Sequence, residues 1–370
     1  MILHLVTDEQ FTDYAIQQFS APEMKSEFVL IPSNFDNWTV KLLDHCTIIK
    51  QNSPEFEDLL NRLGQYSGII LHGLFWGQWQ TQLLHRTPDH VKIAWMYWGG
   101  EIYSRHEFND NFMASITRFL DRLHKRKKYI AADTKWEIPI ELYNRVDYCL
   151  TDAEEEYALG KKLTGGNFKH LWYNYYSIER TVGSLMDGQC NGLNIWIGNS
   201  SSLKNNHVDV LWTLYKEGLL RKLQNHKVII PLSYGEPWVR NVVMKVGRLF
   251  LGKLMQVLVN YIPRDEYNGL MLSCSTMIMN YWQPAAQGNI ITGLWLGMRV
   301  YLSEKCVSYD YFKRIGCKIY SIERDLNRKN PDVFAPMKQE DIDANRAVLR
   351  KWYSREEIHK RNMEIVKALS

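Results

Sequence analysis

Short runs of small and polar residues follow several apolar segments of this chain, and chemistry is to be sought there. The first is Gly198-Asn199-Ser200-Ser201-Ser202, which stands after an apolar run and before a helical segment. Small residues let the backbone approach a phosphate, whose oxygens accept hydrogen bonds from backbone N–H groups and hydroxyls. The alternative is a serine-rich loop that caps the next helix. The run is not GxGxxG, which argues against NAD or FAD.

A similar segment extends from Gln283 to Gly293, again after an apolar run and at the start of a helix. Gln287, Gly288 and Asn289 stand near the first turn of that helix, where unpaired backbone N–H groups favour an anion. We expect a second phosphate contact or a sugar contact there. A tight turn between a strand and a helix explains the same residues equally well.

Two more side chains of the C-terminal half fit a nucleotide ligand. Pro263 begins a helix, so Arg264 lies in its first turn, where the helix dipole favours acids over bases. An arginine at that end could neutralise a diphosphate leaving group. Tyr234, in the segment Ser233-Tyr234-Gly235-Glu236 after another apolar run, could stack on a nucleobase.

The N-terminal half offers an acid and a weaker base. Trp98, Gly99 and Gly100 follow an apolar run and precede Glu101, a carboxylate that could deprotonate an acceptor hydroxyl. An acid that only caps a helix is the alternative. His72, which ends the run before, is a weaker candidate base, because a lone histidine at a strand end is more often structural.

Short apolar runs alternate with helical segments through both halves of the chain. This alternation predicts parallel sheets that are covered on both faces. The predicted strands are 2–6, 28–31, 46–49, 68–73, 91–96, 129–132, 148–151, 168–172, 193–198, 227–232, 255–259, 276–279 and 299–302, and the predicted helices are 55–63, 108–129, 206–223, 236–252, 264–273 and one from about 288. Two Rossmann-like domains that face a cleft are therefore expected, with ligands bound beyond the carboxyl ends of the strands.

Length and composition agree with that organisation. A chain of 370 residues exceeds the usual size of one hydrophobic core. We expect an N-terminal domain over 1–180, a C-terminal domain over 190–337 and a charged helical tail over 338–370. The net charge of +4 is too small for a dedicated nucleic-acid-binding protein.

The sequence shows neither a metal motif nor a membrane-spanning segment. The six cysteines form no CxxC pair, and no Asp-x-Asp stands in a metal-binding context, so a metal-independent mechanism without a cofactor is expected. No stretch reaches the roughly 18–20 apolar residues of a spanning helix, and no signal peptide is recognised, which favours a cytoplasmic protein. The basic segments 118–128 and 239–254 could lie on anionic lipid, although solvated helix faces explain them too.

Three segments resemble glycosyltransferase family 56, the transferases of 4-acetamido-4,6-dideoxygalactose (Fuc4NAc). They are Ile195 to Ser200 with the following Asn206-His207, the stretch from Ile262 to Gly297, and Trp98-Gly99-Gly100-Glu101-Ile102-Tyr103. The likeness spans most of the chain. It departs at the serines after Ser200 and at Gln283–Gly288, which lacks an expected arginine. These departures leave the donor sugar and its nucleotide (dTDP, UDP or GDP) open.

The resemblance implies a GT-B fold and a protein that is peripheral on the cytoplasmic face of the inner membrane. It implies transfer of a fucose-like deoxy-amino sugar from a nucleoside diphosphate to a lipid-linked or other glycan acceptor during synthesis of bacterial surface polysaccharide. By the same resemblance, Gly198, Asn199, Ser200 and Gln287 to Asn289 contact the donor, and Glu101 lies by the reacting centre. A non-catalytic scaffold that binds glycan or membrane, and a nucleotide-sugar epimerase, remain alternatives.

Overall fold

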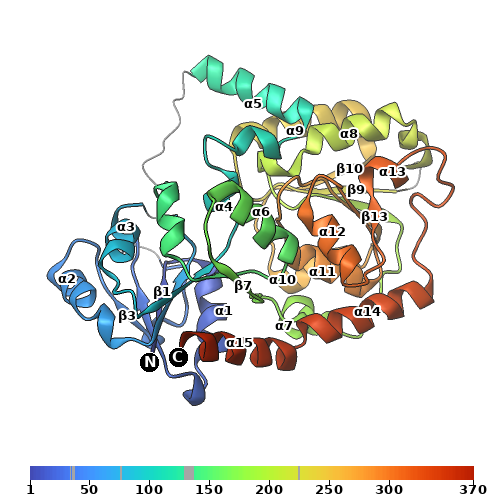
Figure 1. The fold of residues 1–370 in the computed structure, drawn as a ribbon. Helices are drawn as coiled ribbons and strands as arrows, with labels where there is room; N and C mark the ends of the chain where they lie inside the picture. Colours follow the sequence, from blue (N-terminus) through green and yellow to red (C-terminus); the bar gives the residue numbers. More distant parts are fainter. Residues whose placement is uncertain (34, 36–37, 76, 129–136, 224–225) are drawn as a thin grey trace. The chain divides into compact units, whose positions relative to one another are not determined.

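The computed structural model describes residues 1–33, 35, 38–75, 77–128, 137–223 and 226–370 (Figure 1). The described residues form two compact units, each around one parallel sheet. The first unit comprises Met1–His106, Asp133–Ser177 and Arg355–Ser370. The second comprises Glu107–Ala132 and Ile178–Ser354.

The first unit has a sheet with the strand order β3-β2-β1-β4-β5-β6-β7. Its strands are β1 (Ile2–Val6), β2 (Ser26–Leu30), β3 (Cys46–Ile48), β4 (Gly68–His72), β5 (Lys92–Met96), β6 (Tyr148–Leu150) and β7 (Lys169–Leu171), and its helices are α1 (Gln10–Phe19), α2 (Pro54–Asn61), α3 (Gly77–Arg86), α4 (Gly100–Tyr103), α6 (Glu154–Thr164) and α15 (Arg355–Leu369). The central strands β1 and β4 are buried along their whole length, as continuous apolar runs in parallel sheets are.

The C-terminal helix α15 packs onto the first sheet, although it is about 300 residues away from most of its partners in the sequence. Ile365, Val366 and Leu369 join the core cluster that contains Ile2 and Ile70. Gly68 makes this approach possible, since a Cβ atom there would stand 2.7 Å from the Cβ of Leu369. The end of the chain therefore completes the unit in which the chain begins.

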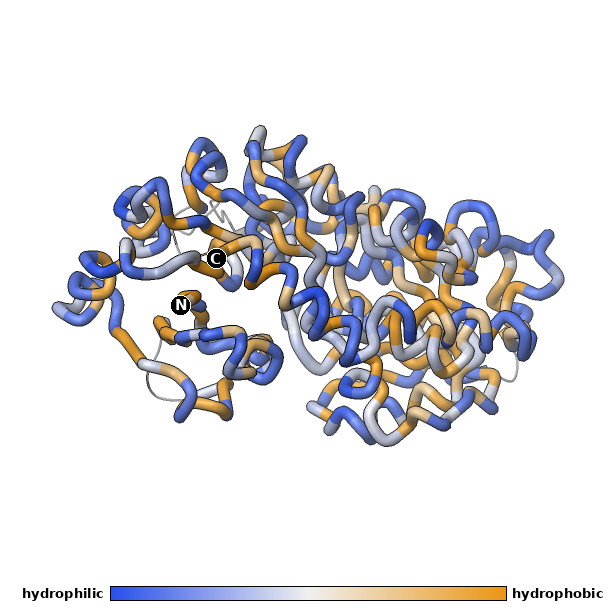
Figure 2. Tube along the Cα trace, turned by 60° about the horizontal axis from the view of Figure 1, so that its bottom comes forward, coloured by the Kyte–Doolittle hydropathy of each residue, from blue (hydrophilic) through white to orange (hydrophobic). Residues whose placement is uncertain are grey.

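The second unit has a sheet with the strand order β10-β9-β8-β11-β12-β13. Its strands are β8 (Asn194–Ile197), β9 (Val228–Pro231), β10 (Met255–Leu258), β11 (Cys274–Met279), β12 (Arg299–Leu302) and β13 (Tyr320–Ser321), and its helices are α5 (Ser115–Lys128), α7 (Ile178–Val182), α8 (His207–Lys216), α9 (Pro237–Leu251), α10 (Arg264–Met271), α11 (Gln287–Leu296), α12 (Val307–Arg314), α13 (Ile322–Asp325) and α14 (Gln339–Tyr353). In Figure 2 apolar residues are concentrated along the inner segments of the tube.

Helix α5 belongs to the second unit because Asp209 of α8 caps its N-terminus. The carboxylate of Asp209 accepts the backbone N–H groups of Ile116 at 2.9 Å and Thr117 at 3.0 Å, and the Thr117 hydroxyl at 2.7 Å. The first N–H groups of a helix have no partner within the helix, so a carboxylate there stabilises the end. The Asn206 side chain also accepts the Ala114 N–H at 2.9 Å.

The predicted fold class is confirmed: the chain is α/β with two Rossmann-like parallel sheets. Two segments group differently from the predicted division. Residues 107–128 fall in the second unit, and the helical tail is shared, with α14 in the second unit and α15 in the first. The predicted strand 129–132 lies outside the described residues. Among the described residues, no helix is both long enough and apolar enough to cross a membrane.

Candidate functional site

The order of the second sheet reverses between β8 and β11, its two central strands. The segments after β8 and β11 therefore diverge from adjacent strand ends, and ligands of open α/β sheets bind in the crevice that such a divergence leaves. The predicted donor residues Gly198 to Ser201 follow β8 directly, and Gln287 to Asn289 follow β11 at the start of α11. The structure thus brings both predicted donor segments to one point of the sheet.

Gly198 is required by two neighbours that approach its backbone. It has φ +66°, and a Cβ atom there would stand 2.5 Å from both Asn205 Oδ1 and His207 Nε2. The Asn205 Oδ1 accepts the N–H of Asn199 at 2.8 Å, and Asn205 Nδ2 donates to Ser200 Oγ at 3.0 Å. Asn205 is thus the internal support of the loop after β8.

Tyr234 extends from the loop after β9 towards the same place. Its backbone carbonyl accepts the Ser201 N–H and the Ser201 hydroxyl, both at 2.7 Å, and its own hydroxyl accepts Asn199 Nδ2 at 2.7 Å. The residue is nevertheless 59% exposed. Its ring is held at the hydroxyl and open to solvent, an arrangement that suits stacking on a flat ligand.

The first turn of α11 carries Gln287, Gly288 and Asn289, which are half-buried. Asn289 Nδ2 donates to the Tyr267 hydroxyl of α10 at 3.0 Å, and Gln287 Nε2 donates to the Tyr353 hydroxyl at 3.3 Å. Ala286 caps the helix in the left-handed region at φ +53°. The positive end of the helix dipole therefore lies at the crevice, where it favours an anion.

Arginine side chains occur at two places around these loops. Arg264, in the first turn of α10, is exposed and donates from Nη1 to the Arg180 carbonyl at 3.0 Å, so part of its guanidinium holds α10 to α7. Arg240 of α9 donates from Nη2 to the Ser233 carbonyl at 3.3 Å, and its buried Nε has no partner among the described residues. Arg240 therefore lies beside the Tyr234 loop, on the basic segment 239–254, for which lipid contact or a solvated helix face was expected.

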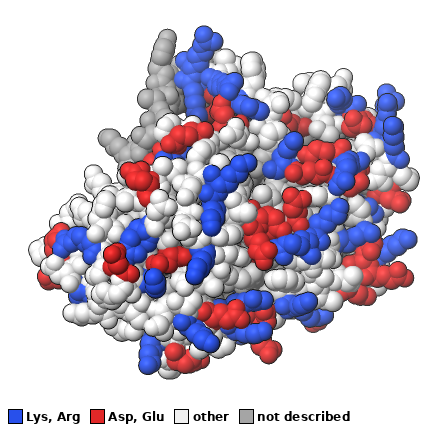
Figure 3. Space-filling view, in the orientation of Figure 1, with Lys and Arg blue, Asp and Glu red and all other residues white. Residues whose placement is uncertain are grey.

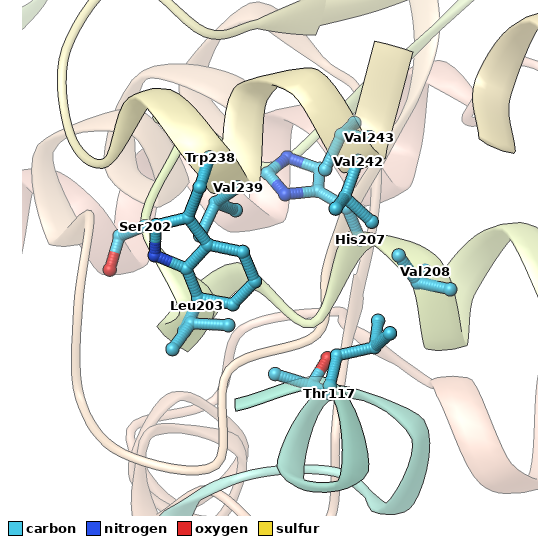
Figure 4. A pocket seen from close by; sticks show the side chains of 10 residues that line it. Thr117, Ser202, Leu203, His207, Val208, Trp238, Val239, Val242 and Val243 are labelled. Carbon is cyan, nitrogen blue, oxygen red and sulfur yellow. The ribbon is translucent and has the colours of Figure 1, made fainter. Parts of the chain in front are cut away.

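A small apolar cavity of about 20 Å³ lies behind the loop, between α5, α8 and α9 (Figure 4). Figure 4 shows the ring of His207, the first residue of α8, beside Val239 and Val243 of α9. Burial lowers the pKa of His207 to about 4, so the ring is neutral. The imidazole thus acts as a packing wall for Gly198 and not as a charged ligand group.

In the first unit, the loop Trp98-Gly99-Gly100 follows β5. Gly99 has φ +84°, and a Cβ atom there would stand 2.7 Å from the Tyr103 ring, while one on Gly100 would stand 2.9 Å from Phe75. The two glycines are therefore needed for packing as well as for the turn.

Glu101 faces into the first unit and is only 1% exposed. Its Oε1 accepts the Trp95 indole N–H at 2.9 Å and the Trp98 backbone N–H at 3.0 Å. Burial raises the pKa of Glu101 to about 7, and burial also raises the pKa of Glu156 to about 8. These contacts make Glu101 a support of the Trp98 loop.

His72 is also buried, at 1% exposure, and lies in a chain of hydrogen bonds. Its Nε2 is 3.2 Å from Nδ1 of His4, and its Nδ1 is 2.9 Å from the Tyr175 hydroxyl. The Tyr175 oxygen also accepts the Trp98 indole N–H at 3.0 Å. Burial lowers the pKa of His72 to about 3, so the ring is neutral. The Tyr175 hydroxyl therefore joins His72 to the Trp98 loop.

The most polar part of the crevice support was not predicted. Asn205 and Tyr281 are buried and both bond Asn199, and the half-buried Tyr267 bonds Asn289. Tyr267 and Tyr281 lie in the stretch from Ile262 to Gly297 that carries the family resemblance, but no sequence pattern marks these two side chains as part of a site. Only the strand order, which places the loops after β8 and β11 together, could have indicated them.

Exposed apolar and basic side chains share the outer side of α5, α8 and α9. In Figure 3 Lys and Arg side chains gather over α5. Phe119 of α5 is 63% exposed and Leu249 of α9 is 78% exposed.

The Trp212 and Tyr215 rings of α8 are also exposed and lie 5.6 Å apart. Lys216, Lys245 and Arg248 are exposed on the same helices. We call Trp212, Tyr215, Leu249 and these three cations the α8–α9 surface.

The fold is that of GT-B glycosyltransferases. HepE from Anabaena, solved with UDP and glucose, matches with a TM-score of 0.61 at 12% identity over 99% of each chain. The lipopolysaccharide outer core galactosyltransferase WaaB matches with 0.62 at 11% identity, over all of this chain and 99% of that one. Sucrose-phosphate synthase from Thermosynechococcus elongatus matches with 0.61 at 11% identity, with the same coverage.

No protein-family model and no curated protein matches the chain. At these identities the solved structures establish the fold alone. The chain accordingly has the GT-B architecture, and its second unit gathers polar side chains and a helix N-terminus at the reversal point of its sheet.

Proposed function

We propose that this protein is a glycosyltransferase that moves a fucose-like deoxy-amino sugar from a nucleoside diphosphate to a lipid-linked or other glycan acceptor in bacterial surface polysaccharide synthesis. The observation that carries the proposal is the convergence of the loops after β8 and β11 at the sheet reversal, joined by the hydrogen bond from Asn206 Nδ2 to the Asn280 carbonyl at 2.7 Å. The solved neighbour HepE binds UDP, and WaaB is a galactosyltransferase.

In this proposal the second unit binds the donor. The Ser200 backbone N–H and the first N–H groups of α11 face the diphosphate, because the N–H groups of Gly198, Asn199 and Ser201 are bonded within the unit. Tyr234 stacks on the base. As the acceptor oxygen bonds the anomeric carbon, the bond from that carbon to the diphosphate oxygen breaks, and the diphosphate leaves with the electron pair. Fixed donors stabilise the growing charge. Arg264 and Arg240 are the cations that we assign to that charge.

The first unit binds the acceptor in this proposal. Trp98, Gly99 and Gly100 form the acceptor loop, and Glu101 and His72 set its shape from beneath. The buried position of Glu101 favours this role over direct deprotonation of the acceptor. The acceptor proton then leaves to another base or, in a retaining reaction, to the departing diphosphate.

The acceptor class favours a peripheral position on an anionic membrane. The α8–α9 surface combines exposed aromatic and aliphatic side chains with cations, a composition suited to the headgroup region of a bilayer. Exposed Phe119 and Leu123 on the basic helix α5 extend the same character.

The test is thermal stabilisation by a panel of dTDP, UDP, GDP and their sugars, because a ligand that binds only the native state raises the melting temperature. A shift with one diphosphate, followed by sugar transfer onto a lipid-linked acceptor, is the expected result. Nucleotide binding without transfer would favour the scaffold, and release of an altered nucleotide-sugar without acceptor would favour the epimerase. No shift with any nucleotide would remove the donor site.

A further inference from the structure

Asn205 has a side-chain amide whose hydrogen-bonding capacity is used completely. Its Oδ1 accepts the Asn199 N–H at 2.8 Å and the Tyr281 hydroxyl at 2.7 Å. Its Nδ2 donates to Ser200 Oγ at 3.0 Å and to the Ser202 carbonyl at 3.3 Å. An amide offers two acceptor sites and two donors, so all four are satisfied. Asn205 is 1% exposed, which makes this group an internal part of the unit.

Tyr281 reaches this amide from a different loop. It follows β11, is 2% exposed, and its hydroxyl lies between the Oδ1 atoms of Asn205 and Asn199. Burial raises the pKa of Tyr281 well above its ordinary value, so the hydroxyl keeps its single proton, which the two Oδ1 atoms share. Asn199 in turn donates to the hydroxyl of Tyr234 at 2.7 Å. The chain of bonds therefore runs from the core to an exposed ring.

We propose that Asn205 and Tyr281 are positioning residues of the nucleotide site, which hold the loop from Gly198 to Ser202 and the ring of Tyr234 in one geometry before the nucleotide binds. The proposal rests on the proposed donor site. A loop that is ordered in advance loses less conformational freedom on binding, so the same contacts give a higher affinity.

The end point of the network argues for this role. A buried polar network is costly unless every member is satisfied, and stability alone is served as well by an apolar core. Here the network ends on Tyr234, which is 59% exposed. Fixing an exposed ring adds little to the core, whereas it prepares a flat surface for a ligand.

The test is the affinity of Tyr281→Phe for the nucleoside diphosphate that stabilises the wild type, measured by isothermal titration calorimetry. The substitution removes one hydroxyl and keeps the ring. Tyr301→Phe is the matched control, because Tyr301 is equally buried in the same unit and donates to the Val333 carbonyl at 2.8 Å, away from the loop. We expect Kd to rise about fivefold to tenfold in Tyr281→Phe and to stay unchanged in Tyr301→Phe.

A second measurement separates positioning from a general loss of stability. The effects of Tyr281→Phe and Tyr234→Phe on Kd are expected to be non-additive, since both break one chain through Asn199. Three results would overturn the positioning role while the donor site stands. They are wild-type affinity in Tyr281→Phe, equal weakening of nucleotide binding in Tyr281→Phe and Tyr301→Phe, and strictly additive effects of Tyr281→Phe and Tyr234→Phe on Kd. Absence of nucleotide binding by the wild type would overturn the donor site itself.

Discussion

The ring of His207 lies against Gly198, with its Nε2 2.5 Å from the place where a Cβ atom on Gly198 would stand. The contact joins the first residue of α8 to the end of β8 and leaves room for glycine alone. This contact explains why a glycine in the left-handed conformation begins the predicted phosphate loop.

Gly198→Ala is therefore expected to lower the free energy of unfolding by about 2 to 4 kcal/mol, through backbone strain and overpacking. Gly218→Ala is the matched control: Gly218 has a similar φ of +68°, but a Cβ atom there would meet nothing within 4 Å. The control is expected to lose about 1 kcal/mol from strain alone. Urea denaturation of both variants measures the difference, and equal losses would contradict the role of the His207 contact.

Glu101→Gln is expected to change how stability depends on pH. Burial raises the pKa of Glu101 from 4.5 to about 7, so the folded protein holds this proton more tightly than the unfolded chain does. The free energy of unfolding that the protonated Glu101 carboxyl contributes is therefore fully present below about pH 4.5 and is lost as the pH rises to about 7. Glutamine cannot ionise, so the variant should gain up to about 3 kcal/mol on the wild type across this window.

Urea denaturation of the two proteins at several pH values checks this expectation. A stability difference that stays constant between pH 4.5 and 7.5 would show that the Glu101 carboxyl does not titrate in the folded protein as its burial requires.

Most strands were predictable because they are short and mainly apolar, as β1 and β4 show with one histidine each, whereas β13 was not predicted. Helix α1 was not predicted, although Phe11, Ala15, Ile16 and Phe19 of its sequence QFTDYAIQQF recur at helical spacing. The predicted helix 206–223 instead ends at Lys216, where Gly218 takes a left-handed conformation and a short 3₁₀ turn, Leu219–Leu223, follows.

The candidate site was predictable only as far as loop composition shows it. Gly198 to Ser202 follows a strand and is visibly small and polar. Glu101 also follows a strand and a loop of small residues, so its carboxylate was expected to face a ligand. The carboxylate instead turns inward to the N–H groups of two tryptophans, which nothing in the local sequence indicates. Tyr281 bonds Asn205 across 76 positions of the chain, and such pairs depend on strand order.

Tyr175→Phe is expected to release the Trp98 indole. Without the hydroxyl, the N–H of Trp98 and the Nδ1 of His72 lose their shared partner, at a cost of about 1 to 3 kcal/mol in stability. The KM for the acceptor should rise while nucleotide affinity stays normal. Tyr173→Phe is the control, since that buried hydroxyl has no partner among the described residues. An unchanged acceptor KM in Tyr175→Phe would separate Trp98 from acceptor binding.

Replacing Trp212, Tyr215 and Leu249 together with serine is expected to lower sedimentation with vesicles that contain anionic phospholipid, by about tenfold. The three side chains are exposed, so folding should be preserved. Tyr261→Ser is the control, because Tyr261 is 84% exposed but lies on the loop after β10, outside the α8–α9 surface. Equal losses in both variants, or equal binding to neutral vesicles, would contradict a specific membrane surface.

The most direct test of the central claim is hydrogen–deuterium exchange of the wild type, with and without the nucleoside diphosphate that raises its melting temperature. A nucleotide at the reversal point of the second sheet should slow exchange in 198–202 and 287–289, and leave the amides of α12 unchanged. Protection confined to other segments, with 198–202 and 287–289 unaffected, would show that the nucleotide binds elsewhere and that the crevice between β8 and β11 is not the donor site.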